Sequence, residues 1–265
     1  MRRSPRLSLA LLLGFVLFGC MQQGPPPPYT PRDLSLRALP LFFYPSADAG
    51  RPARAFVFFF GNDVAFWKPH QLLAQRLSQD GFTVVGLDLR KWLGSLPDRY
   101  PERDSAFRSA IGPIIARSRV EVHAESVPVI LGGHSFGAEV AFWTAAHAPP
   151  PGLVGILAMS PRSSGHLVIV PSDWANHEAT GEGSWSTIRL VHDLPPSIRI
   201  AIIRGQHDEF RPHDSAFAAA GGERLRRYFV PFAGHSLAGL TLPGPFIDRA
   251  MSFLSEPRPA MATTR

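Results

Sequence analysis

The stretch VPVILGGHSFGAEV, residues 127–140, decides how the rest of the chain is interpreted. It opens with a short apolar run typical of a buried strand and closes with an alanine-containing segment typical of a helix. Between them lies Gly133-His134-Ser135-Phe136-Gly137, which fits the pattern G-x-S-x-G. A strand-to-helix turn this sharp strains its central residue and needs small neighbours. The pattern therefore predicts Ser135 as the nucleophile, although Ser135 could instead simply cap the helix.

Outward from this turn, apolar runs and helical patterns alternate along the chain. We expect strands at 55–60, 83–89, 127–131, 153–159, 198–203 and 225–230, and helices at 69–79, 101–117 (interrupted at Gly112-Pro113), 135–146 and 246–254. Strands separated by helices imply parallel crossovers with helices on both faces of the sheet. The predicted fold class is α/β, specifically an α/β-hydrolase fold with a mainly parallel sheet, in a domain over 37–256. Residues 161–195 interrupt the alternation and are predicted as a lid or binding element over the carboxyl edge.

A serine needs a base and an acid to become a nucleophile, and in this fold they follow it in the order Asp, His. Asp208 comes just after the strand at 198–203, and His235 just after the strand at 225–230. Carboxyl ends of parallel strands meet at one edge of the sheet. We therefore predict Ser135, Asp208 and His235 as a catalytic triad, with Glu209 as a second candidate for the acid. Weaker candidates for the base and the acid are His207, His213, His192 and Asp193.

The oxyanion hole of such a site is built from backbone N–H groups. One should come from Phe136, directly after the nucleophile, and the other from Asn62 or Asp63 in the loop after the strand at 55–60. That loop could also be a simple polar turn before a helix. Hydrolysis through these groups requires neither a metal ion nor an organic cofactor.

The amino-terminal residues have a separate character. Three arginines precede an apolar run that ends at Gly19-Cys20, which predicts a lipoprotein-type signal peptide over 1–19 and acylation of Cys20. Met21 favours an outer-membrane destination, with the protein facing the periplasm. A proline-rich linker is expected over 20–36, and a disordered tail over 257–265.

The charge and cysteine content narrow the range of partners. The net charge is +6, and removal of the three signal-peptide arginines leaves +3. The basic residues form no cluster with interleaved aromatics, so nucleic acid is not an expected partner. Cys20 is the single cysteine, which excludes an internal disulfide. We expect an ester substrate and a membrane contact through acylated Cys20, and the sequence does not specify an oligomeric state.

Five segments carry a resemblance to a known family: residues 58–94, ILGGHSFGAEV (130–140), ILAMSPRSSGHLVIVPSDW (156–174), IIRGQHDEF (202–210) and VPFAGHSLAG (230–239). Through them the chain from about 55 to 254 resembles the bacterial virulence proteins of the VirJ/AcvB family. The resemblance implies an exported α/β hydrolase with Ser135, Asp208 and His235 as its triad, acting on aminoacylated phosphatidylglycerol. Where that family has a glycine-rich S-G-D-G-G-W, this chain reads FGNDVAFW at 60–67.

The sequence therefore predicts a serine hydrolase of the cell envelope that cleaves an ester, with an aminoacylated phospholipid as the leading candidate. Two further hypotheses stay open. One is a non-catalytic envelope lipoprotein that keeps the fold and binds a partner or lipid. The second is a carboxylesterase for small acyl groups, or a related peptidase-like activity.

Overall fold

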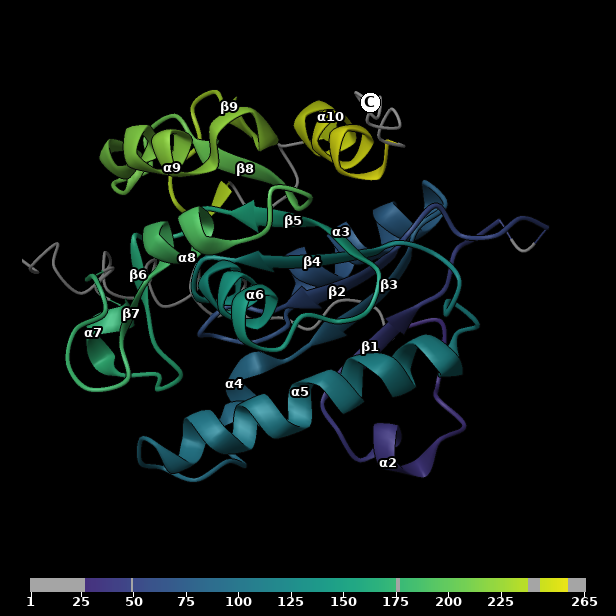
Figure 1. Ribbon diagram of the computed structural model, residues 1–265. Helices are drawn as coiled ribbons and strands as arrows, with labels where there is room; N and C mark the ends of the chain where they lie inside the picture. The colour runs from purple at the N-terminus through teal and green to yellow at the C-terminus, as the bar shows by residue number, and fades with distance from the viewer. Residues whose placement is uncertain (1–26, 49, 175–176, 238–243, 257–265) are drawn as a thin grey trace, which may run out of the picture.

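The computed structural model describes residues 27–48, 50–174, 177–237 and 244–256 (Figure 1). The predicted signal peptide 1–19, the acylation site Cys20 and the predicted tail 257–265 lie outside these residues. No helix in the described part of the chain has the length and apolar character needed to cross a membrane. The elements in chain order are α2 (Leu34–Arg37), β1 (Leu41–Tyr44), β2 (Phe56–Phe60), α3 (Lys68–Gln79), β3 (Thr83–Leu87), α4 (Leu89–Leu93), α5 (Glu102–Glu121), β4 (Val129–His134), α6 (Phe136–His147), β5 (Leu153–Met159), β6 (Ser164–Gly165), α7 (Pro171–Trp174), β7 (Trp185–Ser186), α8 (Thr187–Asp193), β8 (Arg199–Gly205), η1 (Arg211–His213), α9 (Asp214–Gly221), η2 (Gly222–Arg224), β9 (Leu225–Val230) and α10 (Gly244–Ser255).

A seven-stranded sheet with the order β1-β3-β2-β4-β5-β8-β9 forms the centre of the molecule. Every neighbouring pair is parallel except β1 and β3. The predicted mainly parallel sheet is thus confirmed, and β5 and β9 have the predicted bounds. The sequence pattern does not predict strand β1. It is an edge strand of four residues between prolines, and only Phe43 and Tyr44 are buried, so it carries too little alternation to be recognised.

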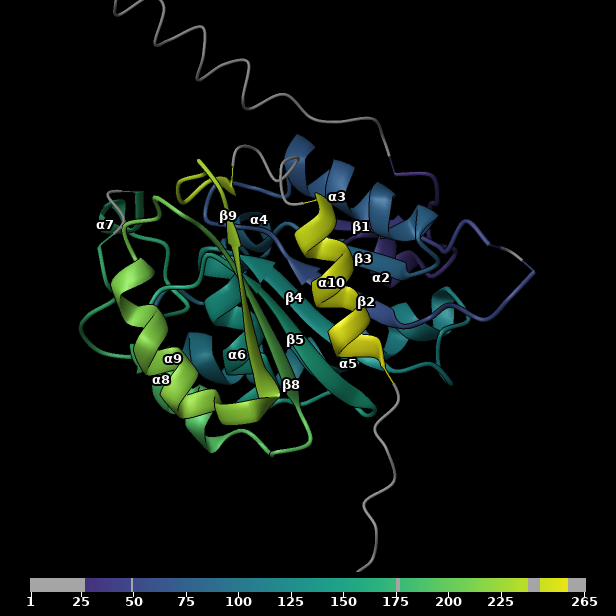
Figure 2. The same cartoon turned by 90° about the horizontal axis from the view of Figure 1, so that it is seen from above.

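Helices cover both faces of the sheet (Figures 1 and 2). In β2, alternate side chains point to opposite sides: Phe56, Phe58 and Phe60 join the core cluster that includes residues of α5, α6, α8 and α9. Val57 and Phe59 join the cluster that includes residues of α3 and α10. A strand buried on both faces has no polar alternation, which explains the continuous apolar run in the sequence.

The interruption predicted at Gly112-Pro113 is wrong, because α5 continues through both residues from Glu102 to Glu121. Pro113 lies on the exposed side of the helix. It removes one intrahelical hydrogen bond, but the carbonyl left without a donor can be hydrated there. The apolar residues around it, Ile111 and Ile114 among them, are buried in the core and hold the helix in one piece.

The prediction that 161–195 interrupts the alternation is only partly right. Its first part holds the small two-stranded sheet of β6 and β7 and the short helix α7. Its last part is α8, which packs against α6 and α9 and buries Leu190 and Val191. This helix supplies the expected crossover from β5 to β8. We refer to residues 161–186 below as the excursion.

The predicted linker 20–36 extends too far. Tyr29 forms a β-bridge with Phe43, and its hydroxyl donates to the Glu121 carboxylate over 2.6 Å. The backbone amides of Arg32 and Asp33 donate to the same carboxylate. Leu36 is fully buried in the core. The carboxylate at the end of α5 therefore anchors the chain from Tyr29 onward to the folded domain, and the part of the linker before residue 27 lies outside the described residues.

Helix α6 begins unusually close to the end of β2. A Cβ atom added at Gly137 would lie 2.3 Å from the carbonyl oxygens of Phe60 and Gly61. Because backbone atoms cannot move aside as a flexible side chain can, only glycine fits at this crossing. The contact sets the first turn of α6 against the loop that follows β2.

We predict that Gly137→Ala lowers the free energy of unfolding by about 1–3 kcal/mol or more, because the added methyl group forces β2 and α6 apart. The matched control is Gly112→Ala in α5, where a Cβ meets no atom within 4 Å. That change should raise the free energy of unfolding by about 0.5–1 kcal/mol through helix propensity. Urea denaturation measures both, and equal midpoints for the two variants would contradict the assigned crowding.

Candidate active site

Ser135 occupies a strained turn between β4 and α6. Its backbone has φ 53° and ψ −125°, a region that residues with a side chain rarely enter. Its amide donates to the Met159 carbonyl over 2.8 Å, which fixes the turn against β5. The residue stands at the amino end of α6, where the helix dipole favours negative charge. This geometry suits a nucleophile at a strand-to-helix turn, although Ser135 is largely buried, and it makes no side-chain capping hydrogen bond to α6.

The structure brings together all three residues of the predicted triad. The Nε2 atom of His235 lies 2.7 Å from the Ser135 hydroxyl oxygen. On the opposite side of the ring, Nδ1 lies 3.3 Å from a carboxylate oxygen of Asp208. Since a carboxylate only accepts, Nδ1 carries the proton and Nε2 is left to accept from the serine. Asp208 follows β8 and His235 follows β9, at the same edge of the sheet as the turn that holds Ser135.

Asp208 is held by more than its histidine. The amide of Phe210 donates to one carboxylate oxygen over 3.0 Å, and the Arg204 guanidinium donates to the second over 2.9 Å. Burial alone would disfavour the charged form. The hydrogen bond from His235 and the charge of Arg204 outweigh it, so the pKa of Asp208 lies well below its ordinary value. Asp208 is therefore a carboxylate wherever the protein is folded near neutral pH.

Arg204 is a part of the site that the sequence pattern does not single out. It is fully buried near the end of β8 and also donates to Asp214 over 2.7 Å and to the Pro161 carbonyl over 2.7 Å. An arginine at the end of the apolar run IAIIRG (200–205), four residues before the acid, is the signal that could reveal it. A buried guanidinium needs this many acceptors to offset its desolvation.

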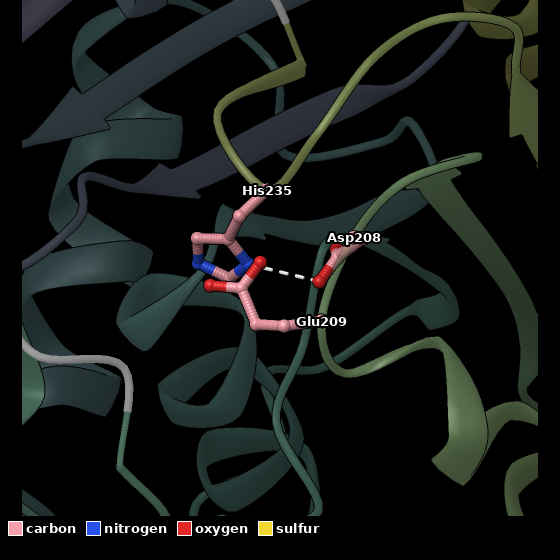
Figure 3. Close-up of side chains that lie close together, drawn as sticks. All are labelled: Asp208, Glu209 and His235. Carbon is pink, nitrogen blue, oxygen red and sulfur yellow. Dashed lines mark hydrogen bonds and ion pairs between the residues drawn. The ribbon is translucent and has the colours of Figure 1, made fainter.

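Glu209, the second candidate for the acid, has its carboxylate in front of the His235 ring in the view of Figure 3. The dashed contact in that view runs from His235 to Asp208, which identifies Asp208 as the orienting carboxylate. Ligand atoms of Asp208, Glu209 and His235 all lie within 4.8 Å of one another, close enough to hold a metal ion. A metal bound through Nδ1 of His235 would displace the hydrogen bond to Asp208, so the observed hydrogen bonds suit proton transfer better than metal binding.

The weaker candidates for the base and the acid have different surroundings. His192 and Asp193 pair with each other on the exposed side of α8. His213 contacts Glu178 in the excursion over 3.1 Å. The side chain of His207 is exposed, while its backbone amide donates to the Ala233 carbonyl and so ties the Asp208 loop to the His235 loop. None of these contacts involves the serine hydroxyl, which is paired with His235.

The loop predicted to complete the oxyanion hole lies against the first turn of α6, as the crowding at Gly137 shows. The Asn62 side chain accepts from the amides of Val64 and Ala65, which shapes the loop. Asp63 is buried, and burial raises the pKa of its carboxyl group although its own backbone amide opposes the rise. Asn62 and Asp63 both stay candidates for the second backbone donor, beside the amide of Phe136.

Solved structures of similar fold were found, whereas no family model and no curated protein sequence matches the chain. A dienelactone hydrolase assigned in Klebsiella pneumoniae has a TM-score of 0.60 at 15% identity, covering 83% of this chain and 93% of that one. Proline iminopeptidase from Mycobacterium smegmatis has a TM-score of 0.59 at 16% identity, covering 81% and 93%. Esterase 2 of Thermogutta terrifontis, phosphonylated by sarin, has a TM-score of 0.54 at 17% identity, covering 82% and 91%.

The chain has the α/β-hydrolase fold. Within this fold, the excursion is attached directly behind the nucleophile. Arg162 donates to both carboxylate oxygens of Glu139 in α6, over 2.9 and 2.8 Å, and to Asp173 over 2.8 Å. Asp173 in turn contacts His166. Glu139 and Arg162 are almost completely buried, and a lone glutamate in the apolar helix FGAEVAFW is the sequence signal for such a pair.

His134, inside the G-x-S-x-G turn of this hydrolase fold, is also buried, and the sequence alone assigns it no role. Its Nε2 atom lies 3.2 Å from the backbone carbonyl oxygen of His235, and its Nδ1 atom lies 3.4 Å from Nε2 of His70. Burial lowers the pKa of His134 to about 4, and the neighbouring His235 adds to that effect. Burial also places the pKa of His70 well below its ordinary value, so both rings are neutral.

This burial makes stability depend on pH. The pKa of His134 is about 4 in the folded protein against an ordinary 6.5, so between these values the unfolded chain binds a proton that the folded protein does not. Stability is therefore fully present above about pH 6.5 and falls by on the order of 3 kcal/mol as the pH falls to about 4. We predict that His134→Gln, which does not titrate, flattens this decline in urea denaturation followed at several pH values. The control His192→Gln, at an exposed position, should show the same pH dependence as the wild type. The same decline of stability with falling pH in the wild type, His134→Gln and His192→Gln would contradict the prediction.

Proposed function

We propose that this protein is a serine hydrolase that cleaves an ester through Ser135, His235 and Asp208. One observation carries the proposal: the 2.7 Å contact between Nε2 of His235 and the hydroxyl of a serine held at positive φ at a helix amino end. A capping serine has no need of either feature. The solved structures of similar fold, which include esterases and hydrolases, support the same reaction class.

The geometry suggests the following acyl transfer. Nε2 of His235 takes the Ser135 proton as the serine oxygen bonds to the ester carbonyl carbon. When the tetrahedral intermediate collapses, the carbon–oxygen bond to the alcohol breaks and His235 returns the proton to that alcohol. A water molecule then repeats the sequence on the acyl enzyme, which releases the acid and restores the serine. Asp208 remains ionised throughout and stabilises the transient imidazolium.

The developing oxyanion would be stabilised by the amide of Phe136 and by that of Asn62 or Asp63. Burial raises the pKa of the Asp63 carboxyl group, which weakens its tendency to place a full negative charge beside the oxyanion. The proposed hole thus consists of two backbone donors, one at the amino end of α6 and one in the loop after β2.

For the substrate we propose an aminoacylated phospholipid, which is what the resemblance to the VirJ/AcvB family implies. The carboxylate of Glu209, which lies within 4.8 Å of ligand atoms of His235 and Asp208, supports an ester whose acyl group carries an ammonium ion, because opposite charges attract. The second candidate is a carboxylesterase for small acyl groups. It is favoured by the likeness to a carboxyl esterase from Bacillus coagulans, with a TM-score of 0.54.

We expect the purified protein to react covalently with a fluorophosphonate probe and to hydrolyse an ester, and Ser135→Ala to lose both activities. The control Ser236→Ala changes an exposed serine next to His235 and should retain both. Lysyl- and alanyl-phosphatidylglycerol would be compared with short p-nitrophenyl esters, and preference for the latter would favour the carboxylesterase. A wild-type protein that takes up no probe would instead be a non-catalytic binder of a partner or lipid.

We further propose that the mature protein is anchored to the membrane through acylated Cys20 and faces the periplasm, with Met21 favouring the outer membrane. Support comes from the order of basic, apolar and small residues before the single cysteine. Cys20→Ala should accumulate as unprocessed precursor or appear in the soluble fraction, as judged by membrane fractionation. Processing that is unaffected by globomycin would contradict the assignment.

A further inference from the structure

Two buried histidines form a chain of contacts behind the proposed triad. His70 lies in the first turn of α3, and His134 lies at the end of β4. His134 bridges Nε2 of His70, at 3.4 Å, and the backbone carbonyl oxygen of His235, at 3.2 Å. Aromatic rings enclose the chain, since His70 stacks on Phe66 with ring centroids 5.5 Å apart. Neither ring of the pair belongs to the proton-transfer mechanism described above.

The contacts fix which ring nitrogens carry protons. The carbonyl oxygen of His235 can only accept, so Nε2 of His134 must be the protonated nitrogen. Because the ring is neutral, Nδ1 of His134 then has a lone pair and accepts from Nε2–H of His70. Both histidines therefore hold the Nε2–H tautomer, and each donates toward the active site. With both nitrogens engaged, His134 is excluded as a competing base for Ser135 although it is the adjacent residue.

We propose that His134 is a positioning residue that holds the His235 loop at the distance proton transfer requires, with its tautomer set by His70. The inference rests on the proposed serine-hydrolase function. It assigns His134 no contact with substrate. His134 acts by donating a hydrogen bond to the backbone carbonyl of His235. This holds Nε2 of His235 at 2.7 Å from the Ser135 hydroxyl oxygen.

The His235 loop needs this support. It contains two non-glycine residues at positive φ, Phe232 at 58° and Leu237 at 50°, which is an unfavourable backbone for both. Among the residues that the structure describes, its backbone hydrogen bonds include His207 to Ala233 and Leu237 to Gly234, which do not involve residue 235. The hydrogen bond from His134 ties residue 235 itself directly to β4. Strain in the loop is thus resisted at the position where it would move the imidazole.

Two substitutions of similar polarity separate positioning from simple packing. In His134→Gln the side-chain amide reaches the place of Nε2 and can still donate to the His235 carbonyl. In His134→Asn the shorter amide reaches only the place of Nδ1, so the donor to His235 is lost. The pair is a matched test because both variants keep a neutral amide in the same buried site.

We expect His134→Asn to lower kcat for ester hydrolysis by about 10- to 100-fold with KM little changed, since a misplaced base slows chemistry and not binding. The rate of fluorophosphonate labelling should fall in parallel. His134→Gln should retain most of the kcat and most of the rate of labelling. Circular dichroism and urea midpoints would show that the two variants are comparably folded. An equal loss of kcat in His134→Gln and His134→Asn would overturn the proposal. So would an unchanged kcat in His134→Asn.

A second measurement does not depend on turnover. Nuclear magnetic resonance of ¹⁵N-histidine-labelled protein should show His134 and His70 as neutral Nε2–H tautomers between about pH 6 and 8. A proton on Nδ1 of His134, or a charged ring in that range, would overturn the inference even in an active enzyme. A wild type that shows these tautomers but hydrolyses no ester would refute the proposed function and leave the hydrogen-bonded link to His235 established.

Discussion

The rest of the structure depends on the close crossing between the first turn of α6 and the backbone at the end of β2. It requires glycine at 137, and it sets the strained Ser135 against the loop of Asn62. Strands β2 and β4 are neighbours in the centre of the sheet, so this crossing is held by the largest part of the core. The proposed nucleophile is therefore positioned before any substrate arrives, and the proposed catalysis depends on such preorganisation.

Two groups of buried ion pairs, around Arg204 and Arg162, connect loops to this part of the fold. Arg204 pairs with Asp208 and Asp214, and Arg162 pairs with Glu139 and Asp173, with little exposure of any of these side chains. Buried ion pairs are weak contributors to stability compared with apolar packing, yet removing one partner is costly. Their value here is geometric. They attach the excursion and the Asp208 loop to the core elements that carry the proposed triad.

The sequence is most informative where one physical pattern dominates. Continuous apolar runs reveal the parallel strands, and the glycines around Ser135 reveal the turn. Strand-end positions then select Asp208 and His235 from ten histidines and many acids, because the topology places those ends at one edge. The contacts of Arg204, Glu139 and His134 depend on which loops face one another in space, and no spacing in the sequence encodes that. Pro113 is misleading for a related reason: its cost is offset by burial of its neighbours, which is a tertiary effect.

The two arginines act on the same short segment. Arg204 donates to the Pro161 carbonyl, and the backbone amide of Arg162, the next residue, donates to Glu139. The start of the excursion is therefore held both from β8, which leads to Asp208, and from α6, which begins next to Ser135. A segment clamped in this way cannot shift without disturbing the arginine that also holds Asp208. The position of the excursion and the orientation of the proposed base are thus coupled through two buried guanidinium groups.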